Sequence, residues 1–294
     1  MHRKRTNRMA KSLAALFLIA AALAGNSSRA DISSRADKSA NGAWLLVDNF
    51  EDGKQFSRWE KRDAGNETDP YQPNPQVTER RKAANGNHYL IKKPAPEGVL
   101  GNRKALSFLP LPQAIAVGET YTLFTRINVE YFPNNHVFGL SSYLPEDIVK
   151  LGYDALEPSL RVTDKTESDG SKNKGALMVK TDRGYAAVVN PVTQQDAQPL
   201  QQNTWYDIWY VVDNARKIAG GQRYDVYIRG GEFTEQTKVY SGASFRIQRE
   251  QPLIYFLTNC NTGPKEQPYG NGGLRYDDIY MAKGLHLSNP IQGI

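Results

Sequence analysis

The sequence predicts an all-β protein in which short antiparallel strands form a two-sheet sandwich. From Ala43 onward, turn-forming residues recur about every eight to fifteen positions. The segments between them are apolar, or alternate between apolar and polar residues, as the strands of antiparallel sandwiches do. Only residues 144–156 resemble a helix, because Pro145 is followed there by two acidic residues.

The expected strands follow one another along a single domain, residues 43–294, because no shift in composition divides it. They cover residues 43–50, 88–93, 105–111, 120–132, 136–143, 160–165, 175–181, 185–191, 204–214, 223–230, 239–247, 252–259 and 274–282. Residues 63–76 and 163–175 are rich in Asn, Asp, Gly, Ser and Pro, so we expect loops there.

Residues 1–30 have the pattern of a cleavable signal peptide. A basic start is followed by the apolar run at residues 12–25 and then by small residues, with cleavage expected after Ala30 or Ala24. The run is too short to span a bilayer, so we expect a periplasmic or secreted protein without a membrane span. The motif SSRAD at residues 27–31 recurs at residues 33–37, and residues 31–42 are expected to be a disordered leader.

The basic character of the chain resides in this first segment. Six of the 37 basic residues lie in residues 1–30 and no acidic residue does, which leaves 31 basic residues against 31 acidic ones. Nucleic-acid binding normally needs a clustered basic surface, so the neutral balance argues against a nucleic-acid partner. The remaining chain is expected to act as a monomer.

Cys260 is the only cysteine, which excludes an intramolecular disulfide. Its place in the apolar run PLIYFLTNC predicts a buried, unreactive thiol.

Three strands alternate clearly between a core face and a mixed face. The expected core faces are Tyr121, Leu123, Thr125, Ile127, Val129 and Tyr131 in the first, Tyr206, Ile208, Tyr210 and Val212 in the second, and Tyr224, Val226 and Ile228 in the third. The opposite faces combine flat aromatic rings with charged groups, which suits a sugar-binding surface. They also fit an ordinary solvated sheet face, and both interpretations stay open.

The candidate carbohydrate-binding residues come from these mixed faces: Trp205, Asp207, Trp209 and Arg229. The two tryptophans can line a groove or pack in a core, since tryptophan is usually largely buried. Trp44 and Trp59 are expected in the core.

Two acidic groups stand near the two ends of the domain. Glu51 and Asp52 surround a turn close to its start, and Asp277 and Asp278 lie in a strand near its end. Because side chains alternate along a strand, the two adjacent aspartates are expected to point to opposite faces. If the first and last strands pair, the two groups meet, and clustered carboxylates are what Ca²⁺ requires.

The chain resembles the concanavalin A-like lectin/glucanase superfamily, most closely the LamG-like jelly rolls of secreted bacterial proteins. The resemblance rests on an opening DNFEDG followed by Trp59, on YDDIY at residues 276–280, on NTWYDIWYVVDN and GQRYDVYIRGG, and on the tail LSNPI. It implies a two-sheet antiparallel jelly-roll sandwich with one concave face. It also implies a structural Ca²⁺ near the termini, with Glu51, Asp52, Asp277 and Asp278 as ligand candidates.

The sharper signatures of enzymes with this fold are missing from the chain. The nearest match to the Glu-x-Asp-x-x-Glu of laminarinase-like glucanases, ESDGSK at residues 167–172, lacks the final glutamate. A lyase acting on a uronate needs a group that neutralises the carboxylate and an acid and a base within reach. Candidates for those roles are Arg126, Glu130, His136 and Tyr227, the last from a strand that could be adjacent. The histidines lack metal-ligand spacing.

The sequence thus predicts a secreted protein that binds a polysaccharide or surface glycan. The alternatives are a polysaccharide-degrading enzyme on the same fold, foremost a lyase for a uronate-containing polymer, and a structural or adhesive surface protein. An Arg, His and Tyr cluster in one groove would favour the lyase. An aromatic platform without such a cluster would favour binding, and a concave face filled by loops of the protein itself would favour the structural role.

Overall fold

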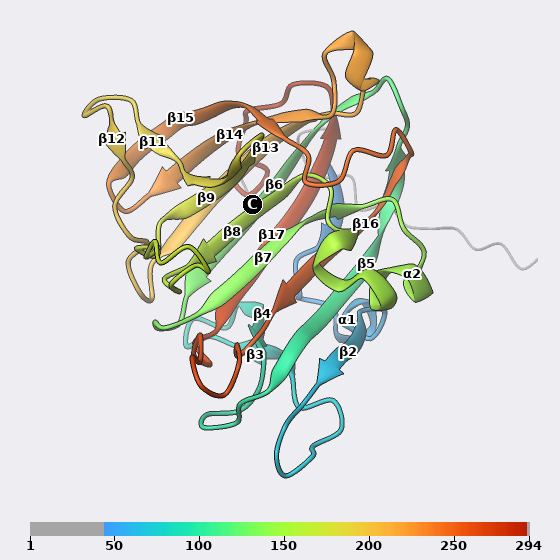
Figure 1. Cartoon of the computed structure of the whole chain (residues 1–294). Coiled ribbons are helices and arrows are strands. Elements are labelled where there is room, and N and C mark those ends of the chain that lie inside the picture. The colour runs from blue at the N-terminus through green and yellow to red at the C-terminus, as the bar shows by residue number, and fades with distance from the viewer. Residues whose placement is uncertain (1–43, 293–294) are drawn as a thin grey trace, which may run out of the picture. The chain divides into compact units, whose positions relative to one another are not determined.

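The computed structural model describes residues 44–292, which form two large antiparallel sheets packed face to face (Figure 1). The predicted two-sheet sandwich is therefore confirmed. The signal peptide and the leader predicted for residues 1–30 and 31–42 lie outside the described residues. In the described part of the chain, no helix is long and apolar enough to cross a membrane.

The first sheet has eight strands. Its order is β15 (Phe233–Ser244), β14 (Arg223–Gly230), β13 (Trp205–Asp213), β6 (Thr120–Val129), β17 (Leu274–Lys283), β4 (His88–Lys93) and β3 (Val77–Lys82), and β1 (Trp44–Asp48) also pairs with β17. The first and last strands of the domain thus lie side by side, as the calcium hypothesis required.

The second sheet has seven strands. Its order is β10 (Gly184–Ala187), β9 (Leu177–Thr181), β8 (Ser159–Thr163), β7 (Asn135–Ser141), β16 (Leu253–Cys260), β5 (Asn102–Ile115) and β2 (Glu60–Asn66). A two-stranded ribbon joins β11 (Val189–Asn190) to β12 (Gln195–Asp196). The helical segments are short: α1 (Gly53–Phe56), α2 (Pro145–Leu151) and the 3₁₀ turns η1 (Gly152–Ala155) and η2 (Lys217–Ala219).

The main core lies between the sheets and contains the residues that the alternation predicted, except Tyr131, which is half-buried with its hydroxyl bonded to Glu97 and Lys93. Ile127, Ile208 and Ile228 are fully buried there, on three neighbouring strands of the eight-stranded sheet. Trp59 and Cys260 are also buried, as expected. Burying such large apolar side chains is the main favourable contribution to folding.

Besides the two-residue β12, two strands of the large sheets were missed by the sequence analysis. β2, with the sequence EKRDAGN, and β3, with the sequence VTERRK, carry charged side chains at most positions and occupy the edges of the two sheets. Charged side chains on edge strands hinder pairing with other molecules, so these strands lack the apolar signal of interior ones.

The predicted helix is present as α2 and η1, and it covers one end of the outer face of the seven-stranded sheet. Ile148 of α2 packs against Leu106, Val137 and Leu257, which point outward from three adjacent strands. Beside this helix, the outer face of the sheet forms the floor of the pocket described below.

The segment after β17 covers part of the outer face of the eight-stranded sheet. The indole nitrogen of Trp44 donates to the Ser288 hydroxyl, and that of Trp209 donates to the Ser288 carbonyl, each at 3.1 Å. Trp44 and Trp209 form an outer cluster with Phe124, against which Ile291 packs. Trp44 is thus buried as expected, although in this outer cluster and not between the sheets.

Candidate functional site

Asp277 and Asp278 lie on the same face of β17, so the prediction that they point to opposite faces is wrong. Arg126 Nη1 lies 4.0 Å from Asp277 Oδ2 and 3.3 Å from Asp278 Oδ2. The register of β17 shifts between Asp277 and Tyr280, and Asp278 has a positive φ of 51°. A bulge of this kind re-aims a side chain and breaks the alternation of the strand.

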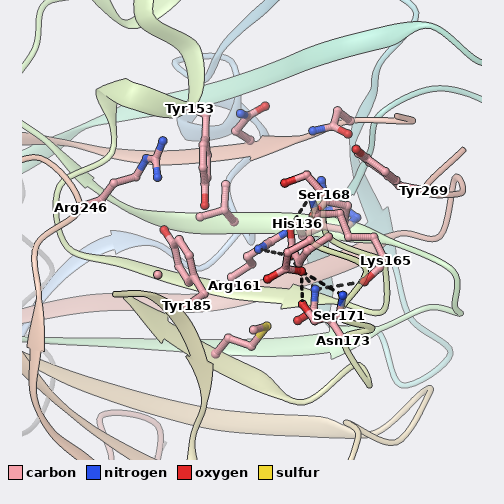
Figure 2. Close-up of a pocket in the computed structure, with 18 of the residues that line it drawn as sticks. His136, Tyr153, Arg161, Lys165, Ser168, Ser171, Asn173, Tyr185, Arg246 and Tyr269 are labelled. Atoms are coloured by element: carbon pink, nitrogen blue, oxygen red, sulfur yellow. Dashed lines mark hydrogen bonds and ion pairs between the residues drawn. The ribbon is translucent and has the colours of Figure 1, made fainter. Parts of the chain in front are cut away.

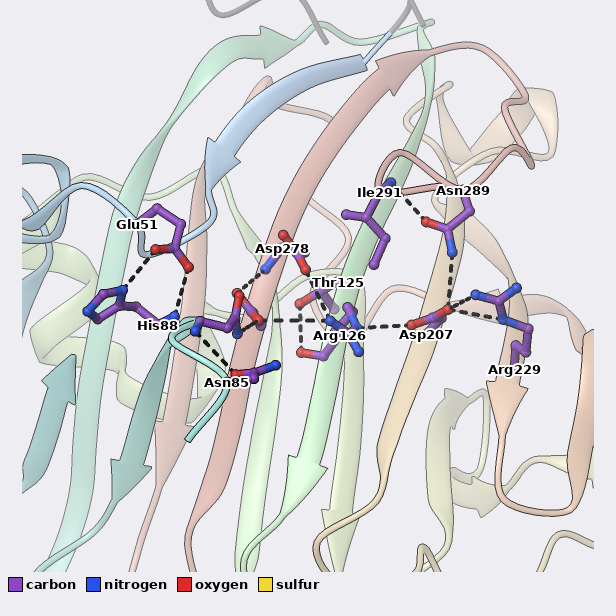
Figure 3. Close-up of polar contacts among 12 residues, drawn as sticks. Glu51, Asn85, His88, Thr125, Arg126, Asp207, Arg229, Asp278, Asn289 and Ile291 are labelled. Atoms are coloured by element: carbon purple, nitrogen blue, oxygen red, sulfur yellow. Dashed lines mark hydrogen bonds and ion pairs between the residues drawn. The ribbon is translucent and has the colours of Figure 1, made fainter. Parts of the chain in front are cut away.

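The two aspartates belong to a ladder of alternating charges across four adjacent strands (Figure 3). Asp277 pairs with Arg126, Arg126 with Asp207, and Asp207 with Arg229 in the register of the sheet. Arg126 Nε lies 3.2 Å from Asp207 Oδ1, and Arg229 Nη2 lies 2.5 Å from Asp207 Oδ2. The ladder therefore brings together Arg126, predicted for catalysis, Asp207 and Arg229, predicted for sugar binding, and Asp277 and Asp278, predicted for metal binding. In the structure these side chains form ion pairs with one another.

The ladder is short of positive charge, since three carboxylates face two guanidinium groups. Burial and the neighbouring Asp278 carboxylate raise the pKa of Asp277 to about 8, and burial also raises the pKa of Asp278. Asp277 Oδ2 accepts a hydrogen bond from Asn87 at 2.8 Å, and its Oδ1 accepts one from the Asp278 amide at 2.9 Å. Burial and the neighbouring carboxylate thus favour the protonated form of Asp277.

The four carboxylates proposed as calcium ligands do not fit a Ca²⁺ site. Glu51 accepts from the amide of His88 at 2.7 Å and lies 2.8 Å from its Nδ1, while Asp52 accepts from the Lys54 amide at the start of α1. Asp277 and Asp278 face Arg126. Ca²⁺ needs six to eight oxygens pointing at one centre, and within residues 44–292 no three His, Cys, Asp or Glu side chains are grouped to hold a metal.

We therefore expect a chelator to leave the melting temperature unchanged. Differential scanning calorimetry with and without excess EDTA, at pH 7 and constant ionic strength, measures this. A lower melting temperature in EDTA that is restored by added Ca²⁺ would show that a calcium site exists and that these carboxylates rearrange to form it.

The predicted sugar-binding tryptophans differ in exposure. Trp209 is only 1% exposed, because the segment after β17 covers it. Trp205 is half-buried on the same outer face, with the Arg126 guanidinium 5.0 Å from its ring centroid and the Tyr89 ring 6.0 Å away. Trp209 therefore packs as a core residue, and Trp205 forms a small aromatic–cation contact beside the charge ladder.

The four residues proposed for a lyase do not converge. Glu130 pairs with Lys93 at 3.0 Å, and Tyr227 is separated from Arg126 by the intervening strand β13. His136 lies in the other sheet, where it is paired with Val162 and points inward with that core residue. Its Nε2 lies 2.8 Å from the Gly272 carbonyl, and burial lowers its pKa to about 4.

A pocket lies on the outer face of the seven-stranded sheet (Figure 2). This outer-face pocket has a volume of about 620 Å³ and is lined from six adjacent strands, β10 to β5 in sheet order. The sheet register places Asn259, Val137, Arg161 and Met178 in one cross-strand row across its floor. Side chains on one face of a sheet share such rows.

The pocket is strongly cationic although the domain is neutral. Six cationic side chains line it against two carboxylates, a formal excess of four positive charges. The cations are Arg103, Lys104, Arg161, Lys165, Arg183 and Arg246, and the carboxylates are Glu167 and Asp169. A cleft lined by one sign of charge concentrates ligands of the opposite sign.

Arg161 is the centre of the polar contacts in the pocket. Its side chain is 9% exposed, and it donates to Glu167 Oε1 at 2.7 Å and to Asn135 Oδ1 at 3.2 Å. Glu167 lies in the loop between β8 and β9, where Lys165 Nζ approaches Oε2 at 2.8 Å and Asn173 donates to Oε1 at 2.7 Å. Buried guanidinium groups with several fixed partners are well suited to recognising carboxylates.

Two tyrosines form an aromatic platform beside Arg161. The rings of Tyr153 and Tyr185 stack with centroids 6.3 Å apart and an angle of 29°. Arg246 lies over Tyr153 at 3.8 Å, and Arg161 lies 5.4 Å from the Tyr185 ring. The Tyr185 hydroxyl is held 2.8 Å from the Ser159 hydroxyl. Figure 2 shows the two rings and Arg246 on one side of the pocket, with Arg161 between them and the group around Lys165 and Asn173.

Sequence reasoning missed this pocket because its residues are dispersed. Arg161 stands between Leu160 and Val162 in a recognisable strand, and an arginine between two core residues is a signal for an outward-facing charge. The remaining groups come from the loop at residues 163–175 and from turns. Nothing in the local sequence shows which loop faces which strand.

No protein-family model and no curated protein sequence matches the chain. Solved structures resemble its fold. The catalytic domain of a GH131 β-glucanase from Podospora anserina is 10% identical, with 70% of this chain and 76% of that chain covered and a TM-score of 0.42. The PL-14 alginate lyase from Aplysia kurodai is 11% identical, with 71% and 87% covered and a TM-score of 0.44.

The acidic lectin of winged bean is 9% identical, with 83% of this chain and 99% of that chain covered and a TM-score of 0.47. At such low identities the likeness concerns the fold and carries no inference about ligand or activity. The two-sheet antiparallel sandwich that the resemblance implied is the fold described above.

Proposed function

We propose that the domain binds an acidic polysaccharide in the outer-face pocket. The observation that carries this proposal is the formal excess of four positive charges around a pocket in a neutral domain. A neutral glycan carries no charge that these cations could attract. A polymer with a carboxylate on each sugar is attracted to them at every repeat. Because residues 1–30 have the pattern of a signal peptide, we propose that this binding takes place in the periplasm or outside the cell.

The aromatic platform supports a sugar polymer over other anions. Tyr153 and Tyr185 offer flat ring surfaces for the apolar face of a pyranose, and their hydroxyls add polar contacts. Arg161 and Arg246 flank the rings. Apolar surface with a few convergent polar groups is the usual composition of a ligand site. His136 is among the residues that line the pocket, but its ring is buried and lies within hydrogen-bond distance of the Gly272 carbonyl, which leaves it poorly placed as the histidine of a lyase cluster.

Cleavage by β-elimination is a second candidate, favoured by the pairing of Tyr185 with Arg161. In such a reaction Arg161 would neutralise the uronate carboxylate, so that the adjacent C–H proton becomes more acidic. A deprotonated tyrosine oxygen would take that proton while a C=C bond forms and the glycosidic C–O bond on the next carbon breaks, and the tyrosine would then return the proton to the leaving oxygen. Tyr185 is the candidate, since its hydroxyl is fixed by Ser159. Burial raises the pKa of Tyr153 well above its usual range, so Tyr153 is a poor base.

The test is to incubate residues 31–294 with acidic and neutral polysaccharides and follow polymer length by size-exclusion chromatography. We expect co-elution with polyuronates and none with a neutral glucan of similar length. Shortening of a polyuronate, with new ultraviolet absorbance from unsaturated ends, would establish the lyase instead. If no acidic polymer co-elutes or shortens, the proposed function is wrong and the structural role takes its place.

A further inference from the structure

We infer that Arg161, Lys165 and Asn173 form a receptor for one uronate carboxylate of the glycan, and that Glu167 occupies this receptor in the free protein. The inference rests on the proposed function and specifies how the same pocket recognises its ligand. Glu167 is then an internal competitor of the ligand: its carboxylate must leave the receptor before a carboxylate of the ligand can bind there.

The contacts of Glu167 have the geometry of a bound carboxylate. Oε1 receives Arg161 Nη1 and Asn173 Nδ2, both at 2.7 Å, and Oε2 receives Lys165 Nζ at 2.8 Å. Each oxygen thus has its own donor, and two of the three donors are cations. Short charge-assisted hydrogen bonds to a planar, two-oxygen group are the pattern by which proteins bind carboxylates.

The donors are fixed independently of Glu167. Arg161 belongs to β8 and is also bonded to Asn135. Lys165 lies over the Tyr269 ring at 4.7 Å, and Asn173 donates to the Lys165 carbonyl through both its backbone and its side-chain nitrogen, each at 3.1 Å. A receptor that keeps its shape when its occupant leaves loses little entropy on binding a new one.

Glu167 can leave without any movement of the backbone. Its side chain is 28% exposed, in contrast to the 9% of Arg161. The surrounding hairpin is closed by backbone bonds from Glu167 to Ser171 and from Gly175 to Thr163. Rotation of the Glu167 side chain toward solvent therefore opens the receptor, while the hairpin holds Lys165 and Asn173 in place.

The test compares the full chain with two single variants, E167Q and E79Q. Glutamine has the size of glutamate and lacks its charge. Glu79 lies on β3 of the other sheet, outside the pocket, and pairs with Arg81 at 3.0 Å, so E79Q removes the same charge without releasing the receptor. Isothermal titration with a polyuronate oligosaccharide measures affinity, and the melting temperature with free glucuronate reports occupation of the receptor alone.

We expect E167Q to bind the oligosaccharide about tenfold more tightly or better, because a like charge no longer competes at contact distance. E79Q should stay within about threefold of the unmodified chain. Glucuronate should raise the melting temperature of E167Q more than that of the other two proteins. Unchanged or weaker binding by E167Q would overturn the inference and identify Glu167 as a support for Arg161.

The two readouts separate this inference from the proposed function. If the unmodified chain binds polyuronates and E167Q gains nothing, the function stands and the receptor inference fails. If no protein binds any polymer, the function fails and the inference with it. In that case a glucuronate effect confined to E167Q would describe only a small-anion site.

Discussion

Replacing Arg161 with glutamine will weaken binding of acidic polysaccharide by about thirtyfold or more, corresponding to about 2 kcal/mol. Arg161 lies at the centre of the pocket floor, is almost fully buried, and directs charge-assisted hydrogen bonds toward the position of Glu167. A ligand carboxylate in that position loses its strongest partner when the guanidinium is removed. Isothermal titration of the full chain with a polyuronate oligosaccharide measures the loss.

The matched control is R275Q. Arg275 is a half-buried arginine of the eight-stranded sheet that donates to Asn128 and Asn203, so its replacement removes the same charge far from the pocket. We expect R275Q to bind within about threefold of the unmodified chain. R161K, which keeps the charge without the planar fork, should fall between the two. Equal losses in R161Q and R275Q would show that net charge, and not the pocket, determines binding.

Replacing Arg126 with methionine will destabilise the domain by about 3 kcal/mol or more at pH 8 to 9. Arg126 is the shared partner of three carboxylates, of which Asp277 is fully buried and Asp207 is 9% exposed. Without it, these groups stay buried and face one another. Urea unfolding followed by tryptophan fluorescence measures the change in the free energy of unfolding.

The loss in R126M should shrink as the pH falls. The pKa of Asp277 is raised from 3.8 to about 8 in the folded protein, so between these values the folded state binds more protons than the unfolded state. Stability therefore increases as the pH falls through this window. Arg126 favours the charged form of Asp277. Its removal therefore lowers the free energy of unfolding most at pH values where Asp277 would otherwise be charged. The difference between R126M and the unmodified chain is thus expected to be smaller at pH 5 than at pH 9.

Two further variants decide whether the charge ladder is the cause. R126M/D277N should recover at least about 1 kcal/mol of the loss at pH 9, because the amide resembles the protonated acid. R229M, which removes a more exposed arginine with a single carboxylate partner, should lose only about 1 kcal/mol. A pH-independent loss in R126M without recovery in the double variant would mean that packing of the arginine stem, not its charge, stabilises the sheet.

The sequence by itself determined the fold class and the buried faces of the strands. Alternation with period two is imposed by the backbone of a strand, so Ile127, Ile208 and Ile228 could be assigned to the core without knowing their neighbours. The same local rule failed at Asp278, where a bulge reverses the direction of one side chain. Alternation correctly placed Trp209 on the face opposite Ile208, but it left open whether Trp209 is covered, since the segment that buries it lies about eighty positions further along the chain.

Only the tertiary structure decided where the candidate site lies. The sequence predicted sugar-binding residues on the eight-stranded sheet, whereas the cationic pocket is on the outer face of the other sheet. Arg161, Tyr185 and Arg246 come from strands and turns spread over 86 positions of the chain. Their side chains line one pocket because β8 and β10 belong to the same sheet and the segment that holds Arg246 lies beside them. Electrostatic focusing and aromatic stacking depend on distances in space. Those distances follow from the order of the strands, which alternation within single strands does not specify.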